Sequence, residues 1–294
     1  LWNGDIQWFT PTEVGHQKYV SKSARTITQL GLQKSSAKKL PAGSILLSSR
    51  ATIGECSIAQ RECTTNQGFQ NLIPKNDTNN EFLYYLAQTK KHHFIKYASG
   101  STFLEISNSE IRKTKCTVPG TEEQTQIAAF LSALDDRISV QNKIIEDLKV
   151  LKKELNYSLI GRIINGKSSN CKIEDVIDYE QPTNYIVKSD KYIENGETPV
   201  LTANKAFLLG YTIENEGVYN KSDCIILDDF TLDFKYVNFP FKIKSSAIKI
   251  LTAKKDIELR YFYEYLLFLG LTSHEHKRHY ISEIAPLPLY LPSI

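Results

Sequence analysis

Residues Gly161 to Ser168 match the pattern of a phosphate-binding loop. The stretch reads GRIINGKS, which is Gly, four residues, and then Gly-Lys-Ser. In nucleotide-binding proteins such a loop follows a buried strand and opens a helix, so that backbone N–H groups and a lysine surround the phosphates. The pattern therefore predicts an ATPase or a GTPase only if the flanking elements come in that order.

The residues before this stretch predict a helix instead of a strand. After Pro119, apolar residues recur at every third or fourth position, and no Pro or Gly intervenes between Gly120 and Gly161. Thr121 and Gln124 have the spacing of a capping box at the helix start. About 40 residues at ~1.5 Å each would make a helix of roughly 60 Å. The apolar stripe that we expect to pack against a partner helix comprises Ile127, Leu131, Leu134, Ile138, Ile145, Leu148, Leu151 and Leu155.

This helix places the loop pattern in the wrong context. Asn165 and Gly166 predict the end of the helix, and the strand-like stretch CKIEDVIDY follows. The order is thus helix, loop, strand, which is the reverse of a nucleotide-binding loop. We interpret GRIINGKS as a chance match.

Other catalytic patterns are weak. Asp228, Asp229 and Asp233 suggest a nuclease metal cluster, but their spacing is poor. The stretch HEHKRH from His274 to His279 is better interpreted as a basic loop than as a metal site. The sequence contains no glycine-rich cofactor turn, no Asn-Pro-Pro-aromatic methylation motif and no Ser/His/Asp signature. We therefore predict no catalytic residue, no metal and no cofactor.

The bulk composition predicts a folded chain of about two domains. The sequence has 294 residues, of which 41% are hydrophobic and 23% charged, so wholesale disorder is excluded. The five cysteines are odd in number and lack CxxC spacing, which predicts reduced thiols in a cytoplasmic protein. No apolar run is long enough to cross a bilayer. Methionine is absent, so we expect that residue 1 is not the native start.

The segments on either side of the predicted helix resemble each other. GDIQWFT matches GETPVLT at an offset of 192 (196 − 4). ILLSSRATIG then matches IILDDFTLDF with Ser48 on Asp228, and FLYYL matches FYEYL, both at an offset of 180. The final match, between two stretches that begin with Ser-Glu-Ile, has an offset of 173 (282 − 109). Matches in one order, with an offset that changes as loop insertions change it, indicate two copies of one domain.

The repeat predicts an α+β fold with two similar mixed α/β domains separated by a long helix that forms a coiled coil. Each copy should contain short strands, a helix at 79–96 or 257–270, and a final strand. The expected boundaries are 1–119 for the first domain, 120–166 for the helix and 167–294 for the second domain. The first copy lacks the counterpart of residues near 170, and we expect a second long helix after Pro292, as an antiparallel partner for the first.

The chain resembles the specificity subunit of type I restriction–modification systems along nearly its whole length. In the first half the resemblance is carried by WNGDIQWFTP, LPAGSILLSSRATIGE, CTTNQGF, ASGSTFLEIS and VPGTEEQTQIAAFLSALDDRI. In the second half it is carried by YEQPTNYIV, TPVLTANKAFLLGYT, DDFTLDFKYVNFPFKIKSSA and HKRHYIS.

This resemblance implies a non-catalytic subunit that recognises double-stranded DNA. Each of two target-recognition domains would read one half of a bipartite site, and two long helices would fix the spacing. The helices would also dock two methyltransferase subunits, and restriction subunits would join them. No membrane partner is implied. Because the two halves differ in sequence, we expect two different half-sites.

The expected DNA-binding residues of the first domain lie in polar loops. Arginine can bind guanine in a bidentate fork, asparagine and glutamine suit adenine edges, and hydroxyls and lysines suit phosphates. The candidates are Ser48, Ser49, Arg50, Asn66, Gln67, Lys96, Ser101 and Thr102. We expect the first three to form an exposed loop after an apolar strand. Asn66 and Gln67 could equally cap a turn, and residues 100–102 could be a plain loop. Lys18 and its basic neighbours are further candidates for phosphate contacts, or a solvated face.

The second domain offers a corresponding set. The candidates are Thr202, Asn204, Lys205, Lys242, Lys244, Ser245, Ser246, Lys277, Arg278 and His279. Asp228 and Asp229 occupy the place of the first domain's serines. Carboxylates can accept from cytosine but repel phosphate, so we favour a role in holding a neighbouring Lys or Arg.

Two other classes of function stay open at this point. A nuclease fused to its DNA reader would depend on the carboxylates. A coiled-coil scaffold would associate through residues 121–160 without selective DNA binding.

Overall fold

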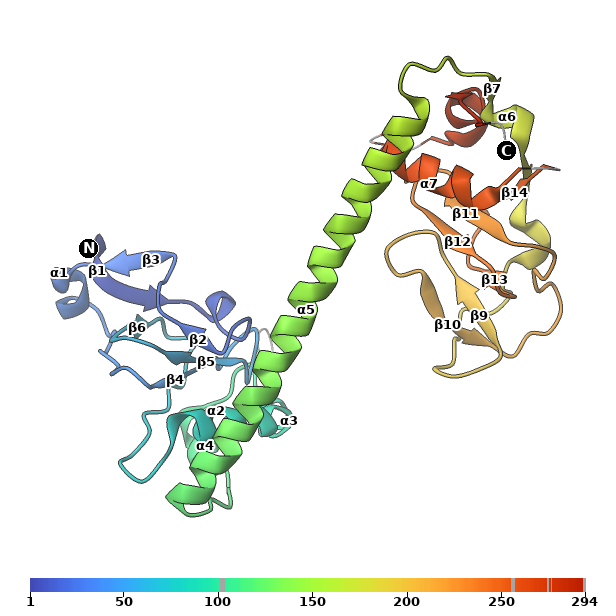
Figure 1. Cartoon of the computed structure of the whole chain (residues 1–294). Coiled ribbons are helices and arrows are strands. Elements are labelled where there is room, and N and C mark those ends of the chain that lie inside the picture. Colours follow the sequence, from blue (N-terminus) through green and yellow to red (C-terminus); the bar gives the residue numbers. More distant parts are fainter. Residues whose placement is uncertain (101–103, 255–256, 274, 276, 293–294) are drawn as a thin grey trace. The chain divides into compact units, whose positions relative to one another are not determined.

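A computed structural model describes residues 1–100, 104–254, 257–273, 275 and 277–292. The chain divides into two compact units, Leu1–Ile144 (unit 1) and Ile145–Ile294 (unit 2). Both units mix short strands with helices, and the long helix α5 runs from one into the other (Figure 1). This confirms the predicted α+β class. No helix among the described residues has the length and apolarity needed to cross a membrane.

Unit 1 contains two small sheets with strand orders β3-β1-β6 and β2-β5-β4. Its strands are β1 (Trp2–Phe9), β2 (Tyr19–Val20), β3 (Arg25–Ile27), β4 (Ile45–Leu47), β5 (Cys56–Ala59) and β6 (Thr64–Thr65). Its short helices are a 3-10 turn (Pro11–Glu13), α1 (Gln29–Gln33), α2 (Asn80–Thr89), α3 (Lys91–Lys96) and α4 (Asn108–Lys113). The predicted helix at 79–96 is therefore two helices, α2 and α3.

Unit 2 contains sheets with the orders β10-β9-β13, β12-β11-β14-β8 and β15-β7. Its strands are β7 (Cys171–Lys172), β8 (Ile177–Glu180), β9 (Thr198–Leu201), β10 (Leu208–Thr212), β11 (Cys224–Asp228), β12 (Phe234–Val237), β13 (Lys242–Ile243), β14 (Ile248–Ala253) and β15 (Pro288–Leu289). Its helices are α6 (Ile173–Val176), a 3-10 turn (Pro182–Tyr185), α7 (Leu259–Leu269) and a π-helical turn (Tyr280–Ile284).

The two units share one arrangement of three strands. In unit 1, β1 pairs in parallel with β6 and places Phe9 opposite Thr65. In unit 2, β9 pairs in parallel with β13 and places Leu201 opposite Ile243. Each central strand also has an antiparallel neighbour, β3 or β10. The pairing is consistent with the offset of 192, which aligns Phe9 with Leu201; their partners Thr65 and Ile243 then differ by 178.

The final strand predicted for each copy forms only in unit 2. There β15 pairs with β7, with Leu289 opposite Cys171. Residues 114–119 of unit 1 form no strand. The described part of unit 1 has no counterpart of β7, so the backbone at 114–119 has no strand to pair with.

Helix α5 (Thr121–Ile164) has 44 residues and ends within the GRIINGKS stretch. Gly161 lies inside the helix, and Gly166 takes the left-handed conformation with φ of 69° just after it. The element that follows is β7, so the order is helix, loop, strand. This confirms that the stretch is not a phosphate-binding loop.

The predicted capping box at the start of α5 is wrong. The helix begins at Thr121, and the buried Gln124 side chain bonds elsewhere. Its Nε2 donates to the carbonyl of Pro119 at 2.9 Å, and its Oε1 accepts from the N–H of Asn79 at 2.9 Å. Gln124 therefore joins α5 to the start of α2, a tertiary role that its sequence spacing does not reveal.

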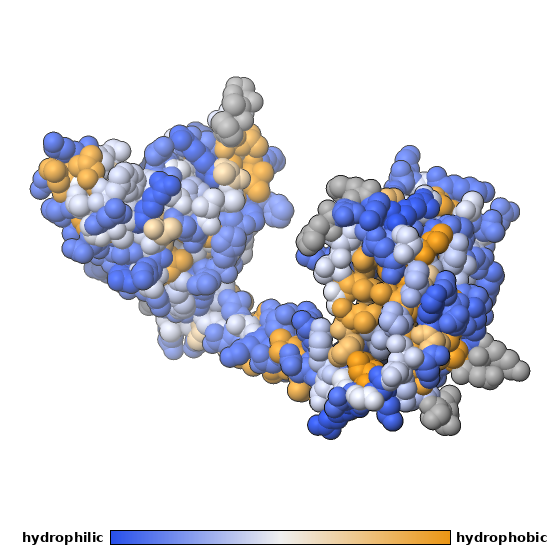
Figure 2. All heavy atoms as spheres, turned by 90° about the horizontal axis from the view of Figure 1, so that it is seen from above, coloured by the Kyte–Doolittle hydropathy of each residue, from blue (hydrophilic) through white to orange (hydrophobic). Residues whose placement is uncertain are grey.

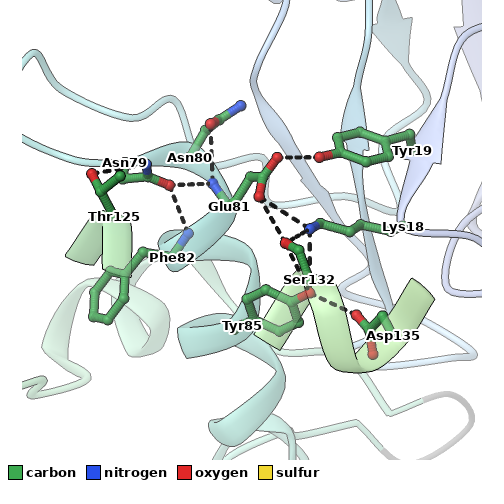
Figure 3. Close-up of polar contacts among 10 residues, drawn as sticks. All are labelled: Lys18, Tyr19, Asn79, Asn80, Glu81, Phe82, Tyr85, Thr125, Ser132 and Asp135. Atoms are coloured by element: carbon green, nitrogen blue, oxygen red, sulfur yellow. Dashed lines mark hydrogen bonds and ion pairs between the residues drawn. The ribbon is translucent and has the colours of Figure 1, made fainter. Parts of the chain in front are cut away.

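A polar network fixes the first part of α5 to unit 1 (Figure 3). Lys18 Nζ contacts Glu81 at 3.2 Å and Tyr85 Oη at 3.2 Å, and it also donates to Ser132 of α5. Tyr85 in turn donates to Asp135 of α5 at 2.6 Å. The Lys18 side chain is only 14% exposed, so the expectation that it binds phosphate is wrong.

In unit 2 the last part of α5 packs on α7, the counterpart of α2. Ile160 is buried in the same core as Phe262 of α7. Asn156 Nδ2 donates to the Glu264 side chain at 2.7 Å and to its carbonyl at 3.0 Å. Each unit therefore anchors a different part of α5 with the same helix of the repeat.

We predict that Glu81→Gln destabilises unit 1 by about 1–2 kcal/mol at neutral pH. Burial raises the pKa of Glu81, but hydrogen bonds from Tyr19, Ser132 and Lys18 outweigh it and lower that pKa. A lowered carboxyl pKa gives stability that is present above the unfolded pKa and lost as pH falls through the folded one. Urea unfolding should therefore show a gap between wild type and variant at pH 7 that narrows below about pH 4. The exposed Asp5→Asn should show no such gap, and an equal gap at both pH values would contradict this account of Glu81.

Candidate nucleic-acid interface

Three loops of unit 1 meet through main-chain hydrogen bonds. The first loop (residues 48–54) follows β4, the second (residues 66–68) follows β6, and the third, of which residues 99–100 and 104–106 are described, follows α3. The N–H of Ser49 donates to the carbonyl of Gly68 at 2.8 Å, and the N–H of Ile106 donates to the carbonyl of Ser49 at 3.1 Å. Candidates that are far apart in the sequence are thus brought to one place.

Unit 2 builds the same junction. Its first loop (residues 228–233) begins at the last residue of β11, its second (residues 244–247) follows β13, and its third, of which residues 273, 275 and 277–279 are described, follows α7. The N–H of Asp229 donates to the carbonyl of Ala247 at 2.8 Å, and the N–H of His279 donates to the carbonyl of Asp229 at 3.0 Å. Asp229 thus occupies the position of Ser49.

The expectation of exposed side chains in the unit 1 first loop is wrong for two of its residues. Ser48 and Ser49 are fully buried. Ser48 Oγ donates to the carbonyl of Arg50 at 2.8 Å, which closes the turn. Small hydroxyl side chains can lie inside such a turn, because they satisfy backbone groups there.

Arg50 is exposed and lies across from the third loop. Its Nε is 2.8 Å from Glu105 Oε2, and the two side chains are partly open to solvent. In the second loop, Asn66 Oδ1 accepts from the N–H of Gly68 at 2.8 Å, so the turn-capping alternative holds for Asn66. Gln67 beside it is exposed. Arg50 and Gln67 therefore remain as unit 1 side chains that could reach a base.

Three further candidates of unit 1 lie apart from this junction or outside the description. Lys96 is exposed at the end of α3, with its Nζ 5.8 Å from the Tyr97 ring centroid. Ser101 and Thr102 lie outside the described residues.

In unit 2, two of the predicted contacts are buried instead. Thr202 is buried, and the Lys242 side chain is only 2% exposed. Lys242 Nζ pairs with Glu214 at 3.1 Å and donates to the carbonyl of Glu216 at 2.6 Å. A buried lysine needs such partners, so Lys242 stabilises the fold and the expectation that it binds DNA is wrong.

The remaining unit 2 candidates that follow β9 and β13 lie close to one another. The N–H of Lys244 donates to the carbonyl of Leu201 at 3.0 Å, which brings the second loop beside residues 202–205. Asn204 and Lys205 are exposed there, while Lys244 pairs with Asp190. Ser245 is half-buried and Ser246 exposed.

The aspartates of the unit 2 first loop act inside the protein. Asp228 Oδ1 accepts from the N–H of Phe230 at 2.9 Å and of Thr231 at 3.0 Å. Asp229 is buried and pairs with the buried Lys249 at 3.6 Å. This confirms that Asp229 holds a neighbouring lysine. Neither aspartate points to a nuclease, since both are occupied by the fold.

The third loop of unit 2 presents part of the predicted basic set. Lys277 and Arg278 are exposed, although Lys277 contacts Glu275 and Glu283. His279 is buried, so the expectation that it contacts DNA is wrong. Its Nδ1 lies 2.8 Å from Glu283 Oε2, a contact that raises the pKa of His279 above its usual value. His274 and His276 lie outside the described residues.

The sequence interpretation missed Glu105, Phe230 and Lys249. Glu105 contacts Arg50, and the Phe230 ring centroid is 5.9 Å from the guanidinium carbon of Arg278. Extending the repeat into the third loop would have aligned Glu105 with Arg278, because both lie at the offset of 173.

A second surface of interest follows α5 and α7 within unit 2. The predicted stripe residues Leu134, Ile138, Ile145, Leu148, Leu151 and Leu155 are exposed, whereas Ile127 and Leu131 are partly covered by unit 1. Leu148, Leu151 and Leu155 line a groove of about 830 Å³ together with Tyr261 of α7. Exposed apolar side chains of this kind appear as orange patches in Figure 2. Exposed apolar residues that gather along one helix are a candidate surface for contact with other elements.

Comparison with known proteins identifies the family. A family model described as the type I restriction modification DNA specificity domain matches residues 1–150. The chain belongs to this family. The match spans half of the chain and includes the complete three-loop junction of unit 1.

Relatives support the assignment over more of the chain. A type I restriction enzyme specificity subunit of Methanocaldococcus jannaschii, MjaIX, is 33% identical over 240 residues, which cover 75% of this chain and 55% of the relative. The EcoR124I/EcoR124II specificity subunit of Escherichia coli is 43% identical over 124 residues, covering 40% of this chain and 31% of the relative. The chain therefore matches about half or less of the length of these relatives.

A solved structure supports the fold. The type I restriction–modification S subunit of M. genitalium aligns with a TM-score of 0.53 at 17% identity, over 91% of this chain and 74% of that one.

We predict that Lys242→Ala destabilises unit 2 by about 1–3 kcal/mol, because it removes a buried cation that bonds to Glu214 and to the carbonyl of Glu216. Urea unfolding of the variant should show the loss. The exposed Lys205→Ala should change stability by less than about 0.5 kcal/mol. If both variants unfolded like the wild type, Lys242 would have no structural role.

Proposed function

We propose that this chain is a non-catalytic, sequence-specific DNA-recognition subunit that directs methyltransferase and restriction subunits to a bipartite target. Residues 1–119 and 167–294 would be the two reading domains, and residues 120–166 the spacer. The observation that carries the proposal is the repeated three-loop junction, in which one backbone framework presents different side chains in each unit.

The chemistry of the junction suits DNA better than a small-molecule substrate. Arg50, Lys205 and Arg278 are exposed on loops, where they can reach base edges or phosphates. The titratable groups most deeply buried beside them, Asp229 and Lys249, neutralise each other. A reader of this kind needs fixed loops and accessible cations, and both units supply them.

The exposed stripe of α5 supports the partner part of the proposal. Its exposed apolar residues lie between the two anchoring regions, from Leu134 to Leu155, and a helix with such a stripe packs against other helices. A second long helix would fit the groove beside α7. Methyltransferase subunits would then dock on the helical pair.

Two rival functions make different predictions. A coiled-coil scaffold would use the same stripe but would not select a DNA sequence. A nuclease fused to its reader would cleave DNA with metal alone and would depend on Asp228 or Asp229.

We predict that Arg50→Ala weakens base discrimination in one half-site by about tenfold to a hundredfold, because a bidentate arginine–guanine pair contributes about 1–3 kcal/mol. The other half-site should be unchanged. The measurement is selection from a randomised duplex-DNA pool by the chain assembled with its methyltransferase subunits, followed by sequencing.

The wild-type pool provides the test of the proposal itself. Two short motifs at a fixed spacing should be enriched. An assembled, folded complex that enriches no motif would favour the scaffold. A uniform loss of affinity with Arg50→Ala, at all positions, would instead identify Arg50 as a phosphate contact.

We also predict that Leu151→Asp weakens assembly with the methyltransferase subunits at least tenfold, because it places a charge in an apolar helix interface. Size-exclusion chromatography of the mixed subunits measures this loss. Leu208→Asp, which changes a similarly exposed leucine on β10, is the matched control and should assemble normally. Equal assembly of both variants would remove the groove from the docking surface.

A further inference from the structure

The repeat places one pair of residues in unit 1 and one pair in unit 2 at equivalent positions. Because Ile106 bonds to Ser49, the neighbouring residues Arg50 and Glu105 face each other across the first and third loops. Because His279 bonds to Asp229, Phe230 and Arg278 face each other in unit 2. The offsets of these loops, 180 and 173, relate one pair to the other (230 − 50 and 278 − 105).

The arginine of each pair comes from a different loop. In unit 1 it is on the first loop, and a carboxylate on the third loop contacts its Nε at 2.8 Å. In unit 2 it is on the third loop, and the ring of Phe230 lies beneath its guanidinium, 5.9 Å from the ring centroid. Both guanidinium groups are exposed. Each is contacted by a side chain of the other loop in its pair, which is Glu105 of the third loop in unit 1 and Phe230 of the first loop in unit 2.

Unit 2 also contains a side-chain lock that unit 1 lacks. The Asp229 carboxylate accepts from the N–H of His279 at 3.1 Å and of Tyr280 at 2.7 Å. In unit 1 the hydroxyl of the equivalent Ser49 has no hydrogen-bond partner among the described residues. The charge of Asp229 is balanced by Lys249, whose Nζ also donates to Gln181 at 2.9 Å.

The fold does not require the hydrogen bonds between the Asp229 carboxylate and the third loop. Lys249 lies opposite Leu227 in the sheet, as Gln70 bonds to Leu47 in unit 1. Unit 1 therefore builds the same junction with the neutral pair Ser49 and Gln70. The extra carboxylate of unit 2 fixes the two residues that directly follow Arg278.

From this geometry we infer that Arg278 is the base-reading counterpart of Arg50, delivered from the opposite loop, and that Asp229 is its positioning residue. This inference rests on the proposed function. Arg278 would take an acceptor-rich base edge such as guanine, with Phe230 setting the plane of its guanidinium. Asp229 would not contact DNA and would act only through the backbone of the third loop.

The test combines three variants with the randomised duplex pool. Arg278→Lys keeps the charge but loses the bidentate fork, so discrimination at one position of the unit 2 half-site should fall about tenfold to a hundredfold. The double variant Asp229→Ser with Lys249→Gln gives unit 2 the neutral pair of unit 1. It should keep the wild-type melting temperature within a few degrees and lose discrimination at that same position. Lys191→Ala, an exposed charge outside the three loops, is the control and should keep full discrimination.

Hydrogen exchange separates positioning from general damage. In the double variant the amides of His279 and Tyr280 should exchange at least tenfold faster, while those of β11 and β14 keep their protection. Rescue of protection and discrimination by Asp229→Asn, which retains an acceptor, would support the lock. Full discrimination in the double variant would overturn the role of Asp229, and full discrimination in Arg278→Lys would overturn that of Arg278. If the wild type enriched no motif, the proposed function itself would fail, so the two failures are distinguishable.

Discussion

A helix of 44 residues with a mostly polar surface is stable only where other elements cover its apolar stripe, and this constraint organises the protein. Unit 1 covers one part of α5 with α2, and unit 2 covers another part with α7. Both contacts combine apolar packing with a polar anchor, which is Gln124 with the Lys18 network in one case and Asn156 in the other. The anchoring helices α2 and α7 are equivalent members of the repeat. Each unit therefore contacts α5 through the same part of its fold.

The three-loop junction also uses one backbone arrangement in both units. Two main-chain hydrogen bonds per unit hold three loops together and do not depend on side-chain identity. Side chains at the junction are therefore free to differ, as Ser49 and Asp229 do, without changing the backbone route. This separation explains how one framework can present an arginine from its first loop in unit 1 and from its third loop in unit 2. Specificity then depends on which residue faces outward.

The sequence predicted the larger elements well because their signals are local. The stripe of α5, its end at Gly166 and the offsets between the repeats all survive in the structure. Side-chain roles were harder to predict. Ser48 and Lys242 look like exposed polar residues in the sequence. In the folded structure both are buried, and Ser48 bonds to the nearby Arg50 carbonyl while Lys242 pairs with Glu214. Gln124 had the spacing of a cap but is used by α2. The equivalence of the pairs Arg50–Glu105 and Phe230–Arg278 required two different offsets, 180 and 173, since loop lengths changed between the copies.

The pairing of β7 with β15 has a consequence for how unit 2 is inserted in the chain. These two strands are the first and last of the unit, and they lie side by side. The segments that lead into β7 and out of β15 therefore lie at the same edge of the unit. The sequence between β7 and β15 can be exchanged for another that also pairs its first and last strands, while α5 is unchanged. The reading surface can thus diverge at a pace independent of the helix that carries it.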